Sequence, residues 1–517
     1  MFRHVTHHVT RCRHSPAAAL ATRLAPNLAA NWPARYPPLP PSTISVASVL
    51  CATKCSQESD TKDTAVQRCQ ESPFHIAGII SAIRKSSRRL WFIDLTDSHL
   101  PASAKIQLMV DYKTQSGLTP NLSPDEFYDQ MAQLHKGDSI ACSGTPFTNP
   151  RGQTGLSLDS LPTLLAPIQS VLPNKLVHKD KINKNKIIAY RVTQDYSTLI
   201  LRNKLLWALR QFLYTRDFIE VETPILTSIP TSSNASKFIT TTNDTSKKNL
   251  FLRIAPELML KRLVISGLPK IFEIGKNFRN EGIDSTHNPE FTTIETYETF
   301  KDLPYLIEFT ESLWKHLFQH LDLTDHPVYK ALQQNNWQFQ KVSFLETFQK
   351  KTNIDLSTID LANTADLLDR IPPHDKRKLP PNLNTLPMAT ILDKLSSFYI
   401  ESISFTHSHL PTLIYDYPTV LSPLSKHKNG HVANRFEVFI NGIEYVNAYE
   451  EQNCPQSQLD AFTAQDPTNI DHDFIDAMKL GMPPTVGFGM GIDRFLMLIS
   501  NTKRIEDVLP LGSLDDL

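Results

Sequence analysis

The chain has 517 residues, too many for a single hydrophobic core, so we expect roughly two or three domains that fold independently. Its composition, 40% hydrophobic and 21% charged, is that of a globular protein, and it contains no apolar run of the roughly 18 residues that span a bilayer. Because the formal net charge is zero, any nucleic-acid partner must be met by a local basic surface.

The N-terminal segment is strongly biased in composition. The first 57 residues contain no Asp or Glu, and arginines recur among Ala, Ser, Thr and Leu. This bias is typical of an organelle transit peptide, and the apolar run at residues 17–21 is too short for a secretory signal. A disordered tail is the alternative, since residues 33–41 are rich in proline. We expect residues 1–70 to be a transit peptide and disordered leader that directs the chain to the mitochondrial matrix.

Short apolar and β-branched runs separated by turn residues begin at Phe74. They predict strands at residues 74–83, 90–95, 105–110, 139–144 and 155–158. Short strands at this spacing suit a barrel of the OB type, although other small barrels have similar spacing. We expect this domain to occupy residues 71–170. Alternation along a strand puts Trp91 and Phe92 on opposite faces, so one of them belongs to the core.

A basic linker is expected at residues 171–195, and in its stretch 175–191 lysines cluster around the single acid Asp180. It would either contact phosphates or serve as a solvated connector. Apolar residues then recur at helical spacing, and residues 218–222 are predicted to form a strand that ends before Pro224. The rest of the chain, residues 196–517, is predicted to form a second domain.

A hairpin with a charged loop is predicted in the middle of the chain, with strands at residues 271–274 and from about Glu290. Side chains of a strand alternate between faces, so Phe291, Glu295 and Tyr297 share one face. An aromatic ring, a carboxylate and a phenol on one wall suit a flat base beside an ammonium group. An exposed sheet face with an incidental acid is the alternative, but it would not explain Arg279 in the preceding loop.

A second hairpin is indicated by the Asn441-Gly442 turn, the favoured sequence for a two-residue connection. Pairing Ile440 with Ile443 sets Glu437 and Glu444 diagonally on one face, roughly 7 to 8 Å apart. At that spacing two carboxylates can share a magnesium ion and still both ionise. Mutually repelling surface acids are the alternative interpretation.

Several of these segments resemble the class II lysyl-tRNA synthetases, and the resemblance extends from about residue 74 nearly to the end of the chain. FRNEG at residues 278–282 and HNPEFT at 287–292 resemble motif 2 in its lysyl form. The glycine-rich stretch that ends in GIDR at 491–494 resembles motif 3, and the helix and strand before Pro224 resemble motif 1. Residues 91–95 and 105–107 are similar to the anticodon-binding barrel of this family.

The resemblance implies an α+β fold, in which an N-terminal OB-type β-barrel precedes a class II catalytic domain built on an antiparallel sheet flanked by helices. It implies ATP-dependent activation of L-lysine to lysyl-adenylate and transfer of the lysyl group to the 3′ end of tRNA(Lys). Magnesium would assist, the chain would form a homodimer, and no membrane partner is expected. No covalent protein nucleophile is required in this mechanism.

The same resemblance implies roles for the matching residues. The ATP-binding residues would be Arg279, Glu281, His287, Asn288, Phe291 and Arg494, with Arg279 and Arg494 catalytic through their contacts with the phosphates. The lysine-binding residues would be Glu257 at the α-amine, Arg279 at the carboxylate, and Glu295, Tyr297, Asn447 and Glu451. Glu437 and Glu444 match the metal-binding acids, and Arg84, Lys85, Phe92 and Gln107 match anticodon-binding positions.

The chain departs from the family pattern in several places, including its C-terminal ending at residues 510–513. Residues 229–235 replace a glycine-rich loop, and Glu450 adds a second acid beside Glu451, which leaves open which of the two faces lysine. A related aspartyl or asparaginyl synthetase is one alternative, but Glu295 and Glu451 stand where those enzymes need cations. A protein-lysylating paralogue would lack the barrel. A catalytically inactive tRNA-binding accessory protein would be expected to have lost Arg279 or Arg494.

Overall fold

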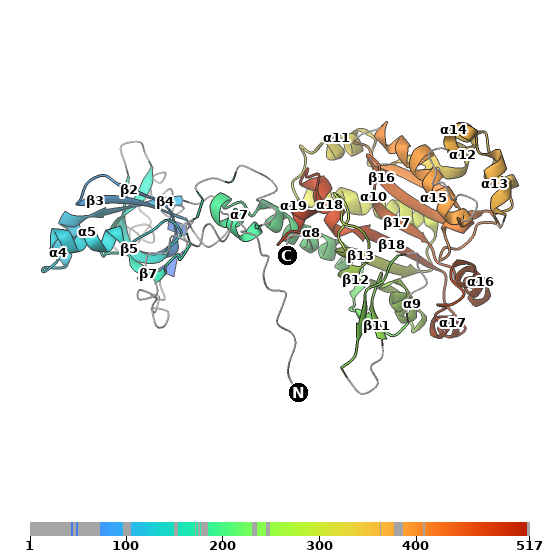
Figure 1. Cartoon of the computed structure of the whole chain (residues 1–517), viewed down its shortest axis with the longest axis horizontal. Coiled ribbons are helices and arrows are strands. Elements are labelled where there is room, and N and C mark those ends of the chain that lie inside the picture. Colours follow the sequence, from blue (N-terminus) through green and yellow to red (C-terminus); the bar gives the residue numbers. More distant parts are fainter. Residues whose placement is uncertain are drawn as a thin grey trace, which may run out of the picture. The chain divides into compact units, whose positions relative to one another are not determined.

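The computed structural model describes residues 43–44, 48–49, 73–96, 105–148, 153–170, 172–173, 176, 185–229, 235–243, 249–361, 363–376, 386–406 and 409–513. The chain divides into two compact units, residues 1–196 and 197–517 (Figure 1). This boundary adjoins the predicted start of the second domain. The expected leader, residues 1–70, lies almost entirely outside the described residues, as does most of the linker.

The first unit is a closed β-barrel of the OB type. Its strands are β2 (Phe74–Lys85), β3 (Leu90–Thr96), β4 (Lys105–Asp111), β5 (Ser139–Thr148) and β6 (Thr154–Leu158). They lie in the order β2-β3-β4-β6-β5, and β5 pairs back to β2 to close the barrel. The short strands β1 (Thr43–Ile44) and β7 (Thr163–Ala166) extend the sheet. The predicted barrel is therefore confirmed.

Two helices between β4 and β5 were not predicted, α4 (Tyr112–Leu118) and α5 (Pro124–Ala132). Helix α5 begins with a capping box, in which Ser123 and Glu126 satisfy each other's backbone N–H groups. Its buried side chains Phe127 and Met131 join the barrel core. Helix α7 (Lys186–Thr193) occupies the end of the expected linker.

The second unit is built on a sheet in the order β14-β15-β16-β17-β18-β13-β12-β8. Its strands are β8 (Ile219–Glu220), β12 (Lys270–Phe278), β13 (Glu290–Thr299), β14 (Gln340–Ser343), β15 (Thr412–Pro418), β16 (Val432–Ile440), β17 (Ile443–Glu450) and β18 (Thr485–Gly491). Pairing is antiparallel from β15 to β12, whereas β14 and β8 join the two edges in parallel. The predicted antiparallel sheet and α+β class are confirmed. A separate small sheet contains β9 (Leu226–Thr227), β10 (Ile239–Thr241) and β11 (Asn249–Leu252).

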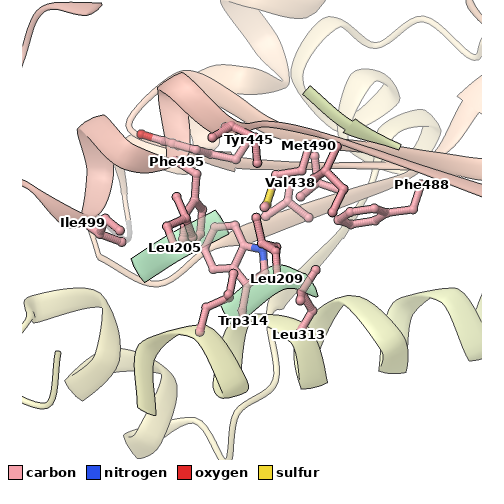
Figure 2. Close-up of a cluster of buried hydrophobic side chains, with 14 of the residues drawn as sticks. Leu205, Leu209, Leu313, Trp314, Val438, Tyr445, Phe488, Met490, Phe495 and Ile499 are labelled. Carbon is pink, nitrogen blue, oxygen red and sulfur yellow. The ribbon is translucent and has the colours of Figure 1, made fainter. Parts of the chain in front are cut away.

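One face of the large sheet packs against helices α8 (Ser197–Tyr214) and α10 (Leu303–His320). Figure 2 shows side chains of this core, with Leu209 from α8 and Trp314 from α10 below Val438 and Met490 of the sheet. Helix α18 (Ile492–Ile499) adds Phe495 to the same cluster. Because this face is apolar and covered, the polar side chains of the central strands are directed to the other face.

Other helices form smaller apolar clusters beside the main core. Helices α9 (Glu257–Ile265), α16 (Pro455–Gln465) and α17 (His472–Met478) pack together through Leu258, Phe462 and Phe474. The chain between α10 and β15 contains the helices α11 (Pro327–Gln334), α12 (Phe344–Thr352), η2 (Leu356–Thr358), α13 (Thr364–Arg370), α14 (Pro373–Lys376), α15 (Met388–Tyr399) and η4 (Glu401–Phe405). Helices η5 (Thr419–Leu421) and α19 (Ile505–Val508) follow later in the chain. None of the helices in the described part of the chain combines the length and apolarity needed to cross a bilayer.

Candidate active site

A cavity of about 220 Å³ opens on the polar face of the large sheet. Its walls come from α9, the loop between β12 and β13, and the strands β13, β17 and β18, which lie side by side in the sheet (Figure 1). Of the site residues predicted in the second domain, those lining the cavity are Glu257, Arg279, Glu281, His287, Asn288, Phe291, Glu295, Tyr297, Glu444, Asn447, Glu451 and Arg494. Only Glu437 is missing from this lining. Segments more than 200 residues apart in sequence therefore meet as predicted.

The basic end of the cavity consists of Arg279, His287 and Arg494. Arg494 Nη2 lies 2.8 Å from Nε2 of His287, and the other ring nitrogen, Nδ1, lies 2.8 Å from Oδ2 of Asp284. A guanidinium group can only donate, so Nε2 must accept and Nδ1–H must donate to Asp284. Although burial opposes it, hydrogen bonds from Thr286 and His287 hold the pKa of Asp284 below its ordinary value. Asp284 thus fixes the tautomer that orients Arg494.

The aromatic wall is provided by Phe291 on β13. The guanidinium carbon of Arg279 lies 5.2 Å from the centre of the Phe291 ring, so the cation and the ring face the same space. Arg279 and Glu281 are exposed at the mouth of the cavity. Asn288 donates to the carbonyl oxygen of Glu290 at 2.7 Å and thereby holds the loop against the start of β13.

The acid end of the cavity consists of Glu257, Glu295, Tyr297 and Glu451. Tyr297 donates from its hydroxyl to Oε2 of Glu295 at 3.2 Å. Burial, and next the nearby Glu257, raise the pKa of Glu295 to about 8. Burial also raises the pKa of Glu451 well above its ordinary value. These carboxyl groups are therefore poised to lose protons when a cation enters.

The choice between Glu450 and Glu451 follows from their contacts. Glu450 accepts hydrogen bonds from the backbone N–H of Leu303 at 2.8 Å and from Asn434 Nδ2 at 2.7 Å, and it does not line the cavity. Glu451 lines the cavity beside Gly487, where an added Cβ would collide with its Oε1. Glu451 is the acid that faces the pocket, and Gly487 is the residue that allows its close approach.

The second predicted hairpin forms, but with an irregularity. Ile440 pairs with Ile443 and Phe439 with Glu444 as predicted, and the register then shifts so that Glu437 pairs with Asn447. The extra residue places Glu437 one position farther from Glu444 along β17 than a regular hairpin would. Glu437 receives hydrogen bonds from Arg435 and from the Tyr417 hydroxyl, at 2.5 Å for the latter. Glu444 is 38% exposed and lies 3.7 Å from Arg494.

Several residues of the site were not predicted. Arg435 donates to Asn447 at 3.0 Å and also pairs with Glu437, so it connects two predicted positions. Arg435 and Glu437 are two residues apart on β16 and so share a face of the strand, and this spacing could have indicated Arg435 from the sequence. Lys261 pairs with Glu257 at 2.7 Å, and the four-residue spacing within a predicted helix would have indicated it. No comparable pattern in the sequence indicated Asp284. Most of the loop that differs from the family pattern, residues 229–235, lies outside the described residues.

On the barrel, three of the four predicted anticodon residues lie together. Phe92 pairs with Arg84 across the strands, and Asp94, two residues farther along β3, is bonded to Arg84 at 2.8 Å and lies 3.5 Å from Gln107 Nε2. Trp91 belongs to the core at 7% exposure, so Phe92 is the outward-facing ring of the pair. Lys85 is separated from this group, since it donates to the Tyr128 hydroxyl at 3.1 Å on the side of α5.

Comparisons with known proteins agree with this geometry. The family model described as tRNA synthetases class II (D, K and N) matches residues 178–514, and that of the OB-fold nucleic acid binding domain matches residues 74–164. The chain is 43% identical over 477 residues to the mitochondrial lysine–tRNA ligase of Saccharomyces cerevisiae, covering 86% of this chain and 82% of the relative.

Two further relatives are similar over comparable lengths. The mitochondrial lysine–tRNA ligase of Schizosaccharomyces pombe is 35% identical over 464 residues, or 85% of this chain and 84% of the relative. The heat-inducible lysine–tRNA ligase of Escherichia coli is 32% identical over 471 residues, or 88% of each chain. On these matches and on the site described above, the chain belongs to the class II tRNA synthetases of the D, K and N group, with an OB-fold domain ahead of its catalytic domain.

Proposed function

We propose that the chain activates L-lysine with ATP to form lysyl-adenylate and then transfers the lysyl group to the 3′ end of tRNA(Lys). The observation that carries the proposal is the acid end beside the basic end within one cavity. Carboxyl groups of Glu257, Glu295 and Glu451 suit a ligand with ammonium groups, whereas Arg279 and Arg494 suit phosphates. The curated relatives named as lysine–tRNA ligases support the same substrate.

The chemistry needs alignment and charge neutralisation rather than a protein nucleophile. The adenine ring stacks on Phe291, and Glu281 at the cavity mouth accepts from its amino group. Arg279 binds both the α-phosphate and the lysine carboxylate, because its planar fork can donate to two oxygen groups at once. With the reacting atoms held together, the carboxylate attacks the α-phosphorus and pyrophosphate leaves, while Arg494 stabilises the developing charge on the terminal phosphates.

Magnesium fits the pair Glu437 and Glu444. Burial and then the charge of Glu437 raise the pKa of Glu444, and the arginines 494, 435 and 279 only partly offset this repulsion. A divalent cation favours carboxylate oxygens and relieves such repulsion. When bound, it would neutralise phosphate charge. Glu444 would be its more accessible ligand, because Glu437 is already bonded to Arg435 and Tyr417.

The aspartyl or asparaginyl alternative is disfavoured by the charges of the acid end. A side-chain carboxylate would need a free cation there, but the buried cation Lys261 is already paired with Glu257 and Glu451. An inactive accessory protein is also disfavoured, since Arg279, Glu281 and Arg494 all line the cavity.

Pyrophosphate exchange assayed with each of the twenty amino acids in turn tests this proposal. We expect lysine alone to support exchange, because burying the carboxylates of the acid end beside a neutral or acidic side chain is costly. Exchange that depends on aspartate or asparagine would show that the chain has the specificity of an aspartyl or asparaginyl synthetase. Absence of exchange with every amino acid would favour the accessory protein.

The remaining expectations are part of the same proposal. The barrel binds the anticodon through Arg84, Phe92 and Gln107, and residues 1–70 direct the chain to the mitochondrial matrix, in keeping with the names of the two yeast relatives. A homodimer forms through the helix and strand of motif 1, where Trp207 is 63% and Ile219 48% exposed. Large exposed apolar side chains of this kind favour a protein interface.

A further inference from the structure

Helix α9 places a fully buried cation beneath the acid end of the cavity. Lys261 is 0% exposed, and the function proposed above gives it no role. Burying an ammonium group is costly unless it is closely paired. Lys261 lies one helical turn after Glu257, so the two side chains project from the same side of α9.

Both partners of Lys261 are carboxylates of the acid end. Its Nζ lies 2.7 Å from Oε1 of Glu257 and 2.5 Å from Oε2 of Glu451. Burial opposes the charge of Lys261, but these two carboxylates raise its pKa above the ordinary value, so the side chain stays protonated. Since Glu451 follows β17, one ammonium group connects α9 with the strand that carries the opposite wall.

The second oxygen of Glu451 is left for a ligand. Within the described part of the chain, Oε1 of Glu451 is buried and has no hydrogen-bond partner. It lies against Gly487 at the cavity wall, where an added Cβ would collide with it. A buried acceptor without a partner indicates a place where a donor is missing. Lys261 thus holds one oxygen of Glu451 and leaves the other directed at the ligand.

The charges around the acid end leave room for two more cations. The groups that face Glu295 and Glu451 are Glu257 and Lys261 from α9, Arg253 from the segment before it, Glu273 from β12, Tyr297 from β13 and Tyr449 from β17. Arg253 pairs with Glu273 at 2.5 Å. With all three other carboxyl groups ionised, Lys261 balances one of them, and two negative charges remain for a ligand. Free lysine carries two ammonium groups.

We propose that Lys261 is a positioning residue for lysine recognition, which holds Glu257 and Glu451 and cancels one charge, so that the acid end matches a ligand with two ammonium groups. The inference rests on the proposed function. Lys261 does not touch the substrate itself. It makes the pocket fit lysine by acting through two carboxylates that do touch the substrate.

The test is the Lys261→Met variant in lysine-dependent pyrophosphate exchange. We expect KM for lysine to rise about 30-fold or more, as for other buried charge pairs that lose one member, while KM for ATP changes less than about threefold. The acid limb of kcat/KM for lysine should move to higher pH, because loss of the neighbouring cation raises the pKa of the Glu451 carboxyl group. A residue that only supports the fold would not move this limb.

Arg262→Met is the matched control. Arg262 is the next residue of α9 and pairs with Asp471 at 2.7 Å, away from the cavity. Its removal deletes a paired cation from the same helix, and we expect both KM values and the pH profile to stay as in the unmodified chain. If Lys261→Met leaves KM for lysine and the pH profile unchanged, or raises the two KM values together, the inference is overturned.

If Lys261→Met does not fold, the double variant Lys261→Met/Glu451→Gln removes both members of the buried pair. The inference predicts that KM for lysine in the double variant exceeds that of Glu451→Gln alone by clearly less than about 30-fold, because only the contact of Lys261 with Glu257 remains to be lost; a further rise of about 30-fold or more overturns it. The unmodified chain separates the two proposals. If it does not exchange with lysine, the proposed function fails, whereas normal exchange with an unaffected Lys261 variant refutes only the present inference.

Discussion

At the residue scale, Glu295 predicts a pH dependence of lysine binding. Its pKa is about 8, raised first by burial and next by Glu257. The ammonium group of lysine needs the ionised carboxylate, so below pH 8 binding must expel a proton. We expect KM for lysine to rise by up to about tenfold for each pH unit below 8 and to level off above it. Initial rates of pyrophosphate exchange between pH 6 and 9 measure this.

The matched variant is Glu295→Gln, which keeps the shape but cannot ionise. It should lose about 2 to 5 kcal/mol of lysine recognition, in the range found for one member of a buried charge pair. Its KM for lysine should also depend less on pH than that of the unmodified chain, while KM for ATP stays unchanged. An unaltered KM for lysine in this variant would contradict the placement of Glu295 at the ammonium group.

The cavity residues were predictable from sequence, but their counter-ions mostly were not. Arg279, Glu295 and Arg494 lie in segments whose sequences are specific to the family. Asp284 and Lys261 act on those residues through contacts that depend on folding, Asp284 by fixing the tautomer of His287 and Lys261 by bridging two acids. Glu451 could be separated from Glu450 only when the partners of Glu450 were seen.

At the scale of elements, Asp493 joins three parts of the catalytic unit. From the first turn of α18, it pairs with Arg202 of α8 at 2.5 Å and accepts from the backbone N–H of Thr292 on β13 at 2.7 Å. Asp493→Asn would leave Arg202, 13% exposed, without its counter-ion. We expect a loss of about 3 kcal/mol in the free energy of unfolding, measured with urea.

The control for this variant is Asp325→Asn, which removes an exposed pair with Lys330. Exposed pairs contribute little, because solvent screens them and holding two long side chains costs entropy. We therefore expect its urea midpoint to stay as in the unmodified chain. Equal effects of the two substitutions would show that the buried contact does not join the elements as described.

Strand periodicity predicted which side chains share a face, but not where the backbone departs from regularity. Phe291, Glu295 and Tyr297 lie together because β13 is regular over its length. The bulge between β16 and β17 sends both Tyr445 and Val446 into the core. It follows from packing against Trp314 and its neighbours, which no local pattern reveals. Helices α4 and α5 were likewise not predicted, because the short apolar runs of this part of the chain indicate strands and give no clear helical spacing.

At the scale of the whole molecule, two units divide the work. Their boundary at residue 197 was predictable, since strand-like spacing gives way to helical spacing near it. The formal net charge of zero was uninformative about RNA, because the basic and aromatic residues predicted to bind the anticodon lie locally on β2, β3 and β4. The proposed activation of lysine uses site residues of the second unit, whereas the proposed charging of tRNA(Lys) also uses the anticodon residues of the barrel.

This division predicts separate effects of substitutions on the barrel. Phe92→Ala removes a ring that is available for base stacking, which contributes about 1 to 3 kcal/mol per base. We expect KM for tRNA(Lys) in aminoacylation to rise about 5- to 150-fold, while lysine-dependent pyrophosphate exchange stays unchanged. Steady-state charging of tRNA(Lys) transcripts and exchange assays on the same preparation measure the two effects.

Neighbouring basic residues on β2 provide the control for this prediction. Arg84 pairs with Phe92 across the strands, whereas Lys85 lies with Tyr128 on the side of α5. Because adjacent side chains of a strand point to opposite faces, Arg84→Ala should weaken tRNA binding and Lys85→Ala should not. Equal losses from both would mean that this surface attracts RNA by charge alone. An effect of Lys85→Ala without one of Phe92→Ala would place the anticodon on another face of the barrel.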